Sequence, residues 1–279
     1  DIIKNKMIIW IASYPKSGNT YLRSFLSSYY FSKKGKFDFK LLMNILQFPS
    51  TRFSQKDFLS FDDAARNWIA NQKFFFKKEK LFFLKTHNCL NEYKNFEFTT
   101  SNETLGAIYI VRDPRNIITS VKNHNDFNNY EEALKFMQND NAILNDYKHL
   151  KNYAKTTIIN SWRINYQSWL QNNFYRRMTI RYEDMITRPN EVFRDLVVFV
   201  NTLCRFNESV NLQKLNNSIQ TTSFDKLKDI ENQGNFSESV YSLKDKRKIK
   251  FFFLGPKNDW RKELDKSLIK KMNEYYKED

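Results

Sequence analysis

Residues 7–20 read MIIWIASYPKSGNT, an apolar run that ends in a cluster of polar, proline and glycine residues. The run Met7–Ser13 is typical of a strand buried on both faces of a parallel sheet, because no polar residue alternates along it. Helical periodicity follows from Asn19 to Phe31. The segment Ser13–Thr20 therefore joins a strand to a helix, and its backbone amides together with the helix dipole are predicted to face an anion.

The side chains of this loop suit a phosphate ligand. Lys16 adds a mobile positive charge, Gly18 lets the backbone approach an anion closely, and Thr20 supplies a hydroxyl donor. A strand-helix turn with chance polar residues is the alternative interpretation. Against the kinase-type loop G-x-x-x-x-G-K-[ST], the chain has Ser13 at the first glycine and Asn19 at the lysine, so it is a poor kinase loop.

Strands and helices alternate along the rest of the chain. Further strands are predicted at Leu81–Lys85, Ala107–Val111 and Met178–Tyr182. Helices are predicted from Pro114 onward, with Asp113 as the cap, and at Glu131–Lys151, Ile158–Asn172 and Pro189–Leu203, whereas the stretch up to Lys78 is predicted to hold short helices and loops. This order predicts an α/β fold, a single doubly wound domain over residues 1–279 with a central parallel sheet flanked by helices.

Three polar residues follow the predicted strands. Ligands in open parallel sheets gather at the carboxyl ends of the strands. Lys16, His87 and Arg112 lie just after three of these strands. They are therefore expected to converge although they lie far apart in the sequence.

Composition narrows the function classes. A chain of 279 residues with 41% hydrophobic side chains can bury one large core. Lys and Arg outnumber Asp and Glu by 46 to 31, a net charge of +15 that favours an anionic ligand or surface, although basic runs such as Lys244–Lys250 are typical of solvated faces. A nucleic-acid-binding module is a weaker alternative, because the sequence has no recognised motif of that class and its aromatic residues are not interleaved with basic ones in a single patch.

Cysteine usage and hydropathy bear on location. Cys89 and Cys204 form neither a disulfide framework nor a Cys-x-x-Cys metal site, which fits a reducing compartment. Met7–Ala12 is far shorter than the roughly 20 residues that span a bilayer. The chain is expected to be cytoplasmic and without a membrane partner. Whether a membrane anchor preceded residue 1 is left open.

Five motifs together resemble one family. Tyr14–Tyr21 reads YPKSGNTY and resembles Y-P-K-S-G-T-T-W, the 5′-phosphosulfate loop of sulfotransferases that use 3′-phosphoadenylyl sulfate (PAPS). Ile108–Ser120, IYIVRDPRNIITS, resembles the 3′-phosphate motif of that family, and Lys85-Thr86-His87 resembles its K-x-H. Tyr182-Glu183-Asp184 and Thr222-Ser223-Phe224 resemble its adenine-side elements.

The resemblance implies a P-loop nucleotide-kinase-like fold and a role for each matched residue. His87 would be the general base, with Lys16 and Lys85 stabilising the transferred group. The residues implied to bind PAPS, or its product PAP, are Lys16, Ser17, Gly18, Asn19, Thr20, Tyr21, Arg112, Ser120, Tyr182, Thr222, Phe224 and Gly255. The implied reaction moves a sulfonate group to a hydroxyl or amine of a small-molecule or glycan acceptor, without a metal and without a nucleic-acid or membrane partner; the oligomeric state is left open. A histidine near its unperturbed pKa of about 6.5 suits the base role.

One motif departs from the family. The final element resembles R-K-G-x-x-G-D-W, whereas residues 253–260 read FLGPKNDW, so Phe253 and Leu254 replace two charges. Losing a charged hydrogen bond costs about 1.5–3 kcal/mol unless something replaces it. The Gly255 backbone, Arg112, Ser120 or Lys257 would have to hold the 3′-phosphate. Two alternatives therefore remain open, a PAP-binding protein without catalysis and an atypical P-loop kinase. The acceptor walls are expected within Phe37–Phe83 and part of Asp126–Asp146.

Overall fold

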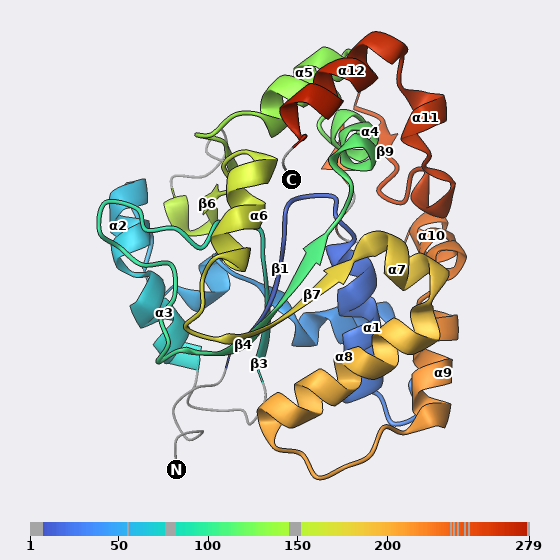
Figure 1. Cartoon of the computed structure of the whole chain (residues 1–279). Helices are drawn as coiled ribbons and strands as arrows, with labels where there is room; N and C mark the ends of the chain where they lie inside the picture. Colours follow the sequence, from blue (N-terminus) through green and yellow to red (C-terminus); the bar gives the residue numbers. More distant parts are fainter. Residues whose placement is uncertain are drawn as a thin grey trace.

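A parallel β-sheet forms the centre of the computed structural model, which describes residues 8–54, 56–75, 82–144, 152–234, 236, 238, 240–242, 244 and 246–277 (Figure 1). Five strands follow the order β2-β3-β1-β4-β7, and each neighbouring pair is parallel. Their bounds are β1 Ile8–Ser13, β2 Leu46–Gln47, β3 Phe82–Thr86, β4 Thr104–Val111 and β7 Arg176–Arg181. Strands β3 and β4 flank β1, with β2 at one edge and β7 at the other, so strands lie on both sides of the first strand, which is the doubly wound arrangement that the sequence predicts.

Strand β1 is buried on both faces. Ile9 and Ile11 belong to one hydrophobic cluster, whereas Trp10 and Ala12 belong to another on the opposite face. Successive side chains of a strand point to opposite faces, so a continuous apolar run needs cover on both sides. The apolar run read from the sequence therefore marks the central strand of the sheet.

Helices cover both faces of the sheet (Figure 1). One face packs against α1 and α8, with α7 and α9 beside them. The other face packs against α2, α3 and α6. The bounds are α1 Asn19–Phe31, α2 Phe61–Arg66, α3 Trp68–Phe75, α6 Trp162–Leu170, α7 Tyr182–Thr187, α8 Pro189–Cys204 and α9 Leu212–Thr221.

A third cluster lies beyond the carboxyl ends of the strands. There α4 (Pro114–His124), α5 (Tyr130–Met137) and α12 (Lys266–Tyr275) bury apolar side chains against one another. The remaining elements are α10 Phe224–Asn232, α11 Trp260–Glu263, the hairpins β5 Ile143–Leu144 with β6 Thr157–Ile158 and β8 Val240–Tyr241 with β9 Lys248–Ile249, and the short 3₁₀ helices η2 Phe39–Asn44, η3 Thr51–Phe53, η4 Tyr153–Lys155 and η5 Gly255–Lys257. This cluster and α10 cover the end of the sheet at which the strands have their carboxyl ends.

Several predicted boundaries are wrong, each for a local reason. The helix predicted over 131–151 ends at Met137, because the Asn139 side chain accepts the Asn141 amide hydrogen and a turn forms. Its last part, 145–151, lies outside the described residues. The helix predicted from Ile158 starts at Trp162, after a Ser161 cap. Strand β4 starts at Thr104, three residues before the prediction, because Thr104 pairs with Ile8 at the start of β1.

The remaining predictions agree more closely with the described residues. Helix α1 has the predicted bounds, and α8 exceeds its prediction by one residue. The predicted strand at 178–182 is β7, whose last residue is Arg181, because Tyr182 begins α7. Residues 7 and 81, which begin two predicted strands, lie outside the described residues. The stretch from 33 to 78 contains short helices as expected, together with the edge strand β2.

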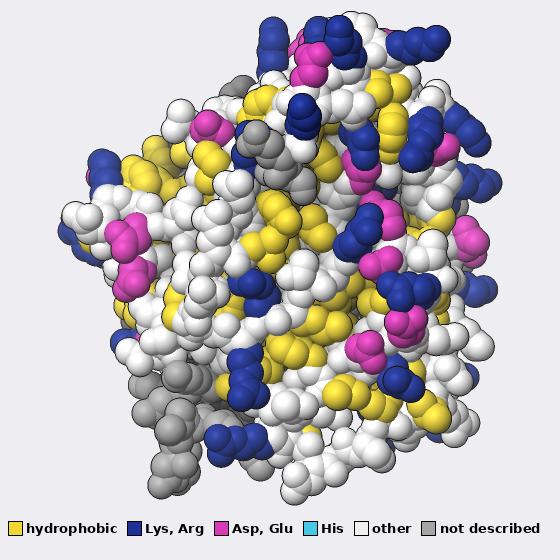
Figure 2. All heavy atoms as spheres, viewed as in Figure 1, with side chains coloured by type: hydrophobic (Ala, Val, Ile, Leu, Met, Phe, Trp, Pro, Cys, Tyr) yellow, Lys and Arg dark blue, Asp and Glu magenta, His cyan; other side chains and the backbone are white. Residues whose placement is uncertain are grey.

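The surface is charged but mixed. On the face shown in Figure 2, Lys and Arg side chains are spread among Asp, Glu and apolar side chains. Within the described ranges, every helix is too short or too polar to cross a membrane.

Candidate functional site

A cavity of about 350 Å³ lies at the carboxyl ends of β1, β3 and β4. Its volume falls in the range of small-molecule sites, roughly 300–1,000 Å³. Most of the predicted site residues line it, from segments far apart in the sequence: Lys16, Gly18, Asn19, Thr20, Tyr21, Lys85, His87, Arg112, Ser120, Tyr182, Phe224 and Gly255. The predicted convergence of Lys16, His87 and Arg112 at one edge of the sheet is therefore confirmed.

Two predicted residues, Ser17 and Thr222, do not line this cavity. Thr222 is fully buried, and its hydroxyl donates to the Ser218 carbonyl oxygen at 2.7 Å, as hydroxyls in helices commonly do. The Thr222 side chain is therefore not placed to contact a ligand in this cavity. Ser17 is buried in the loop, and its hydroxyl has no hydrogen-bond partner in the described part of the chain.

The loop before α1 has the backbone of an anion cradle. Lys16 and Gly18 have φ angles of 67° and 99°, and Gly18 caps the helix without any side-chain bond. The first amides of α1 therefore have no capping side chain to satisfy them. A Cβ at Gly18 would clash with the Tyr182 ring. Asn19 ties the loop to β1, because its amide donates to the Ile11 carbonyl oxygen at 3.1 Å.

Arg112 is a buried cation beside this loop. Its side chain is only 6% exposed, and Nη1 donates to the Lys16 carbonyl oxygen at 2.9 Å. The guanidinium lies 4.2 Å from the centre of the Tyr182 ring, and its Nε has no partner within the described chain. Burial lowers the Arg112 pKa. A buried guanidinium with an unsatisfied donor is costly unless an anion binds it.

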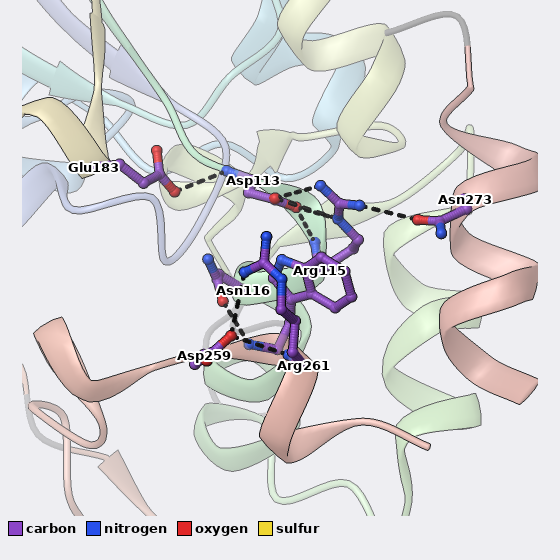
Figure 3. Close-up of polar contacts among 8 residues, drawn as sticks. Asp113, Arg115, Asn116, Glu183, Asp259, Arg261 and Asn273 are labelled. Atoms are coloured by element: carbon purple, nitrogen blue, oxygen red, sulfur yellow. Dashed lines mark hydrogen bonds and ion pairs between the residues drawn. The ribbon is translucent and has the colours of Figure 1, made fainter. Parts of the chain in front are cut away.

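The rest of the Arg-Asp-Pro-Arg motif holds the C-terminal segment in place (Figure 3). Asp113 accepts hydrogen bonds from the Arg115 side chain, with a shortest distance of 2.7 Å, and Arg115 in turn donates to Asn273 of α12 at 3.0 Å. The Trp260 amide donates to the Asn116 side chain at 3.1 Å. Of the two arginines in the motif, only Arg112 lines the cavity, and Arg115 positions α11 and α12.

His87 presents one ring nitrogen to the protein. Its Nδ1 lies 2.7 Å from the Ser13 carbonyl oxygen, which can only accept, so Nδ1 carries the hydrogen and Nε2 carries the lone pair. Burial, and then the charge of Lys85, lowers the His87 pKa to about 3. The expectation of a pKa near 6.5 is therefore wrong for this ligand-free site, where the imidazole is neutral and carries its lone pair at Nε2.

The two lysines of the site are crowded cations. Burial, and then the charge of Lys85, lowers the Lys16 pKa to about 7. Burial also lowers the Lys85 pKa to about 8. Desolvation and like charge both disfavour the ammonium form, and the opposite charge of a bound anion would counteract them. These two cations therefore favour the binding of an anion in the cavity.

Two charged or titratable residues of the cavity were missed from the sequence. His124 lies four residues after Ser120 on the same face of α4, a spacing that could have identified it. Glu238 accepts hydrogen bonds from Thr20 at 3.0 Å and from Arg23 at 2.6 Å. Burial raises the Glu238 pKa, but the charges of Lys85 and Arg23 and these hydrogen bonds lower it by more. The net result is a Glu238 pKa below its usual range. No sequence signal marks Glu238.

The C-terminal segment closes the cavity with rings and backbone. Phe251 to Gly255 all line it, whereas Lys257 is exposed and does not. Gly255 has a φ of 56°, and a Cβ there would clash with the Phe224 ring. Gln47, Phe136 and Leu144, which lie within the two segments expected to form acceptor walls, also line the cavity. Part of the cavity wall is therefore apolar.

Other chemistries find little support in the described residues. Cys89 is buried, its thiol donates to the Ile159 carbonyl oxygen at 3.1 Å, and burial raises its pKa to about 12, so it is a poor nucleophile. Within the described chain, no group of three or more His, Cys, Asp or Glu side chains is placed to hold a metal ion.

Comparison with known proteins gives one family and one fold. A family model described as "Sulfotransferase domain" matches residues 7–279. No curated protein sequence matches the chain significantly. Among solved structures, the mouse sulfotransferase SULT7A1 complexed with PAP is similar at 16% identity and a TM-score of 0.58, over 96% of this chain and 81% of that one. A retinol dehydratase complexed with androsterone and the inactive cofactor PAP is similar at 14% identity and a TM-score of 0.57, over 97% and 79% of the chains.

Proposed function

The chain belongs to the sulfotransferase domain family, and from this premise we propose that it transfers the sulfonate group of PAPS to a small-molecule acceptor. The observation that carries the proposal is the meeting of Lys16, Lys85, His87 and Arg112 in one cavity at the ends of β1, β3 and β4. We further propose that residues 1–279 form one domain, since the family match spans 7–279. The thiols of Cys89 and Cys204 are both free, which supports a reducing, cytoplasmic location.

The cavity fits a nucleotide that carries several phosphate oxygens. Arg112 Nε and the Ser17 hydroxyl are buried donors without partners among the described residues, and a side chain at Gly18 would clash. Arg112 and Ser120 are proposed to hold the 3′-phosphate, because Phe253 and Leu254 bring no charge to the lining. Tyr182 and Phe224 are proposed to flank the adenine.

His87 is proposed as the general base. Its Nε2 lone pair takes the proton of the acceptor hydroxyl as the acceptor oxygen bonds to sulfur and the bond from sulfur to the bridging oxygen breaks. The bridging oxygen becomes a terminal oxygen of the 5′-phosphate of PAP. Lys16 is proposed to stabilise the charge that grows on that oxygen, and Lys85 to hold the sulfonate. Phe136, Leu144 and Gln47 are proposed to contact the acceptor, whose body would then be partly apolar.

Ligand-dependent stability is the first test of this function. PAP at 100 times its dissociation constant should stabilise the native state by about 2.7 kcal/mol, which raises Tm by roughly 5 °C in a chain of this length. ATP with magnesium is the control, and it should raise Tm less. Stabilisation by ATP alone would favour the kinase alternative instead.

Turnover is the second part of this test. Acceptors incubated with PAPS should gain the mass of one sulfonate group. PAP binding without transfer to any acceptor in a broad panel would contradict the enzymatic proposal and favour a binding protein, the alternative that Phe253 and Leu254 motivate.

Removing the carboxylate charge at residue 238 should tighten nucleotide binding. Glu238 accepts from Thr20, a proposed phosphate donor, so an incoming anion meets a like charge there. Glu238→Gln should lower the Kd of PAP by about tenfold, because like charges in apposition cost binding energy. Calorimetric titration with PAP measures this change. Glu208→Gln, at an exposed residue, is the matched control. Unchanged or weaker binding by the Glu238→Gln protein would show that the carboxylate does not compete with the nucleotide.

A further inference from the structure

His124 contacts Lys16 in the lining of the cavity. Its Nδ1 lies 3.4 Å from Lys16 Nζ, and its ring meets the Phe251 ring edge to face at 5.9 Å between centroids. The Phe251 ring also lies against the same ammonium, 3.7 Å from ring centre to Nζ. Lys16 is thus held between an imidazole nitrogen and an aromatic face.

The direction of the hydrogen bond fixes the form of the imidazole. A charged lysine can only donate, so Nδ1 of His124 must present its lone pair and Nε2 must carry the hydrogen. Burial, and then the charges of Lys16 and Lys85, lowers the His124 pKa to about 3, so the ring is neutral at ordinary pH. His87 has the opposite tautomer, because its Nδ1 donates to the Ser13 carbonyl oxygen.

This contact solves a positioning problem. A lysine side chain loses about 2 kcal/mol of rotamer entropy when it is held in one place. Arg112 fixes only the backbone carbonyl of Lys16, at 2.9 Å. Among the residues that the structure describes, the His124 lone pair and the Phe251 ring hold the ammonium without a carboxylate in contact, which leaves it able to donate to a bound anion.

We propose that His124 is the positioning residue for Lys16, and that its Nδ1 lone pair and the Phe251 ring form a clamp that aims the ammonium at the oxygen leaving sulfur. The aim of the clamp rests on the proposed function. The clamp itself is a property of the ligand-free protein, so the two can fail separately.

The clamp has a consequence for pH dependence. The charged groups acting on Lys16 are Lys85 and Arg112, which lower its pKa, and Glu238 and Glu231, which raise it. An acceptor at Nδ1 of His124 also favours the ammonium form. Removing that acceptor should lower the pKa of Lys16 and move the alkaline fall of kcat/KM for PAPS to lower pH.

Two substitutions separate the lone pair from the ring. His124→Phe keeps a ring against Phe251 but has no acceptor, whereas His124→Asn can place its carbonyl oxygen near the position of Nδ1. A misplaced catalytic group can cost about 100-fold in rate, so kcat of the His124→Phe protein should fall by about 10- to 100-fold with little change in KM for PAPS. The His124→Asn protein should keep most of the rate and the unshifted alkaline fall. Equal loss in both proteins would overturn the clamp.

A spectroscopic measurement tests the clamp without activity. The chain has 3 histidines, so ¹⁵N spectra of the ligand-free protein are simple to assign, and they are recorded below pH 7, where Lys16 is charged. His124 should show the Nε2–H tautomer and His87 the Nδ1–H tautomer, and Lys16→Met should move the Nδ1 shift of His124. A protonated Nδ1 at His124, or a shift that Lys16→Met leaves in place, would overturn the proposal. Absence of sulfonate transfer with the expected spectra would contradict the proposed function and leave the clamp standing.

Discussion

Replacing His87 by asparagine should lower kcat by about 10²- to 10⁴-fold, the usual range for loss of a general base, while the Kd of PAP changes little. The asparagine amide can donate to the Ser13 carbonyl oxygen as Nδ1 does, at 2.7 Å in the native protein, but it has no atom in the position of Nε2. The substitution therefore removes the proposed base and keeps its anchor. Steady-state turnover and PAP titration measure the two effects.

The pH profile makes this prediction more specific. Because burial and Lys85 lower the His87 pKa to about 3, the ring is already neutral at pH 5. A base with a lowered pKa is active above that pKa and lost as pH falls through it. The profile of kcat/KM for PAPS should therefore show no acid-side fall near pH 6.5 that depends on His87. Such a fall, absent from the His87→Asn protein, would contradict the lowered pKa.

Controls separate chemistry from local disturbance. Cys89→Ser lies two residues away and keeps a donor for the Ile159 carbonyl oxygen, so it should leave kcat within a few-fold of the native value. Added imidazole should restore part of the activity of His87→Ala, because the free base can enter the vacated space. Full turnover in the His87→Asn protein would rule out His87 as the base.

Much of the fold follows from local sequence signals. The continuous apolar run at β1 predicts burial on both faces, and the Gly18–Asn19 junction predicts where α1 begins. Boundaries inside polar, periodic segments were predicted less well. The helix predicted after Glu131 ends early because the Asn139 side chain closes a turn, and helical periodicity alone does not register such a side-chain bond.

The site residues that belong to sequence motifs were predicted, and those outside the motifs were not. His87 and Arg112 follow strands whose ends meet, so their convergence is a consequence of topology. Glu238 lies far from every motif in the sequence. It meets Thr20 because the fold of the C-terminal segment brings it there, and local sequence does not predict that contact. The pKa of His87 was predicted wrongly, because desolvation depends on what covers a residue and the residues that cover it are distant in sequence.

Replacing Lys16 by methionine should lower kcat by about 10²- to 10³-fold, the range found when one donor to a developing oxyanion is removed. Methionine keeps most of the aliphatic stem against the Phe251 ring but carries no charge for the oxygen that leaves sulfur. PAP binding should weaken by about tenfold, the cost of one lost charged hydrogen bond. Turnover and calorimetric titration measure the two effects, and Lys34→Met, at an exposed lysine, is the control.

Lys16→Arg tests the charge itself. Burial and Lys85 lower the Lys16 pKa to about 7 in the ligand-free protein, so the ammonium form is lost as pH rises through 7. The kcat/KM for PAPS reports the free enzyme and should fall above that pH, whereas kcat reports the nucleotide complex, in which bound phosphates favour the ammonium, and should fall only at higher pH. An arginine stays charged throughout this range. The alkaline fall in kcat/KM should therefore be absent from the Lys16→Arg protein, even if its longer side chain lowers the absolute rate. An alkaline fall that persists unchanged in the Lys16→Arg protein would assign that fall to another group, such as Lys85, the other lysine that lines the cavity with a lowered pKa.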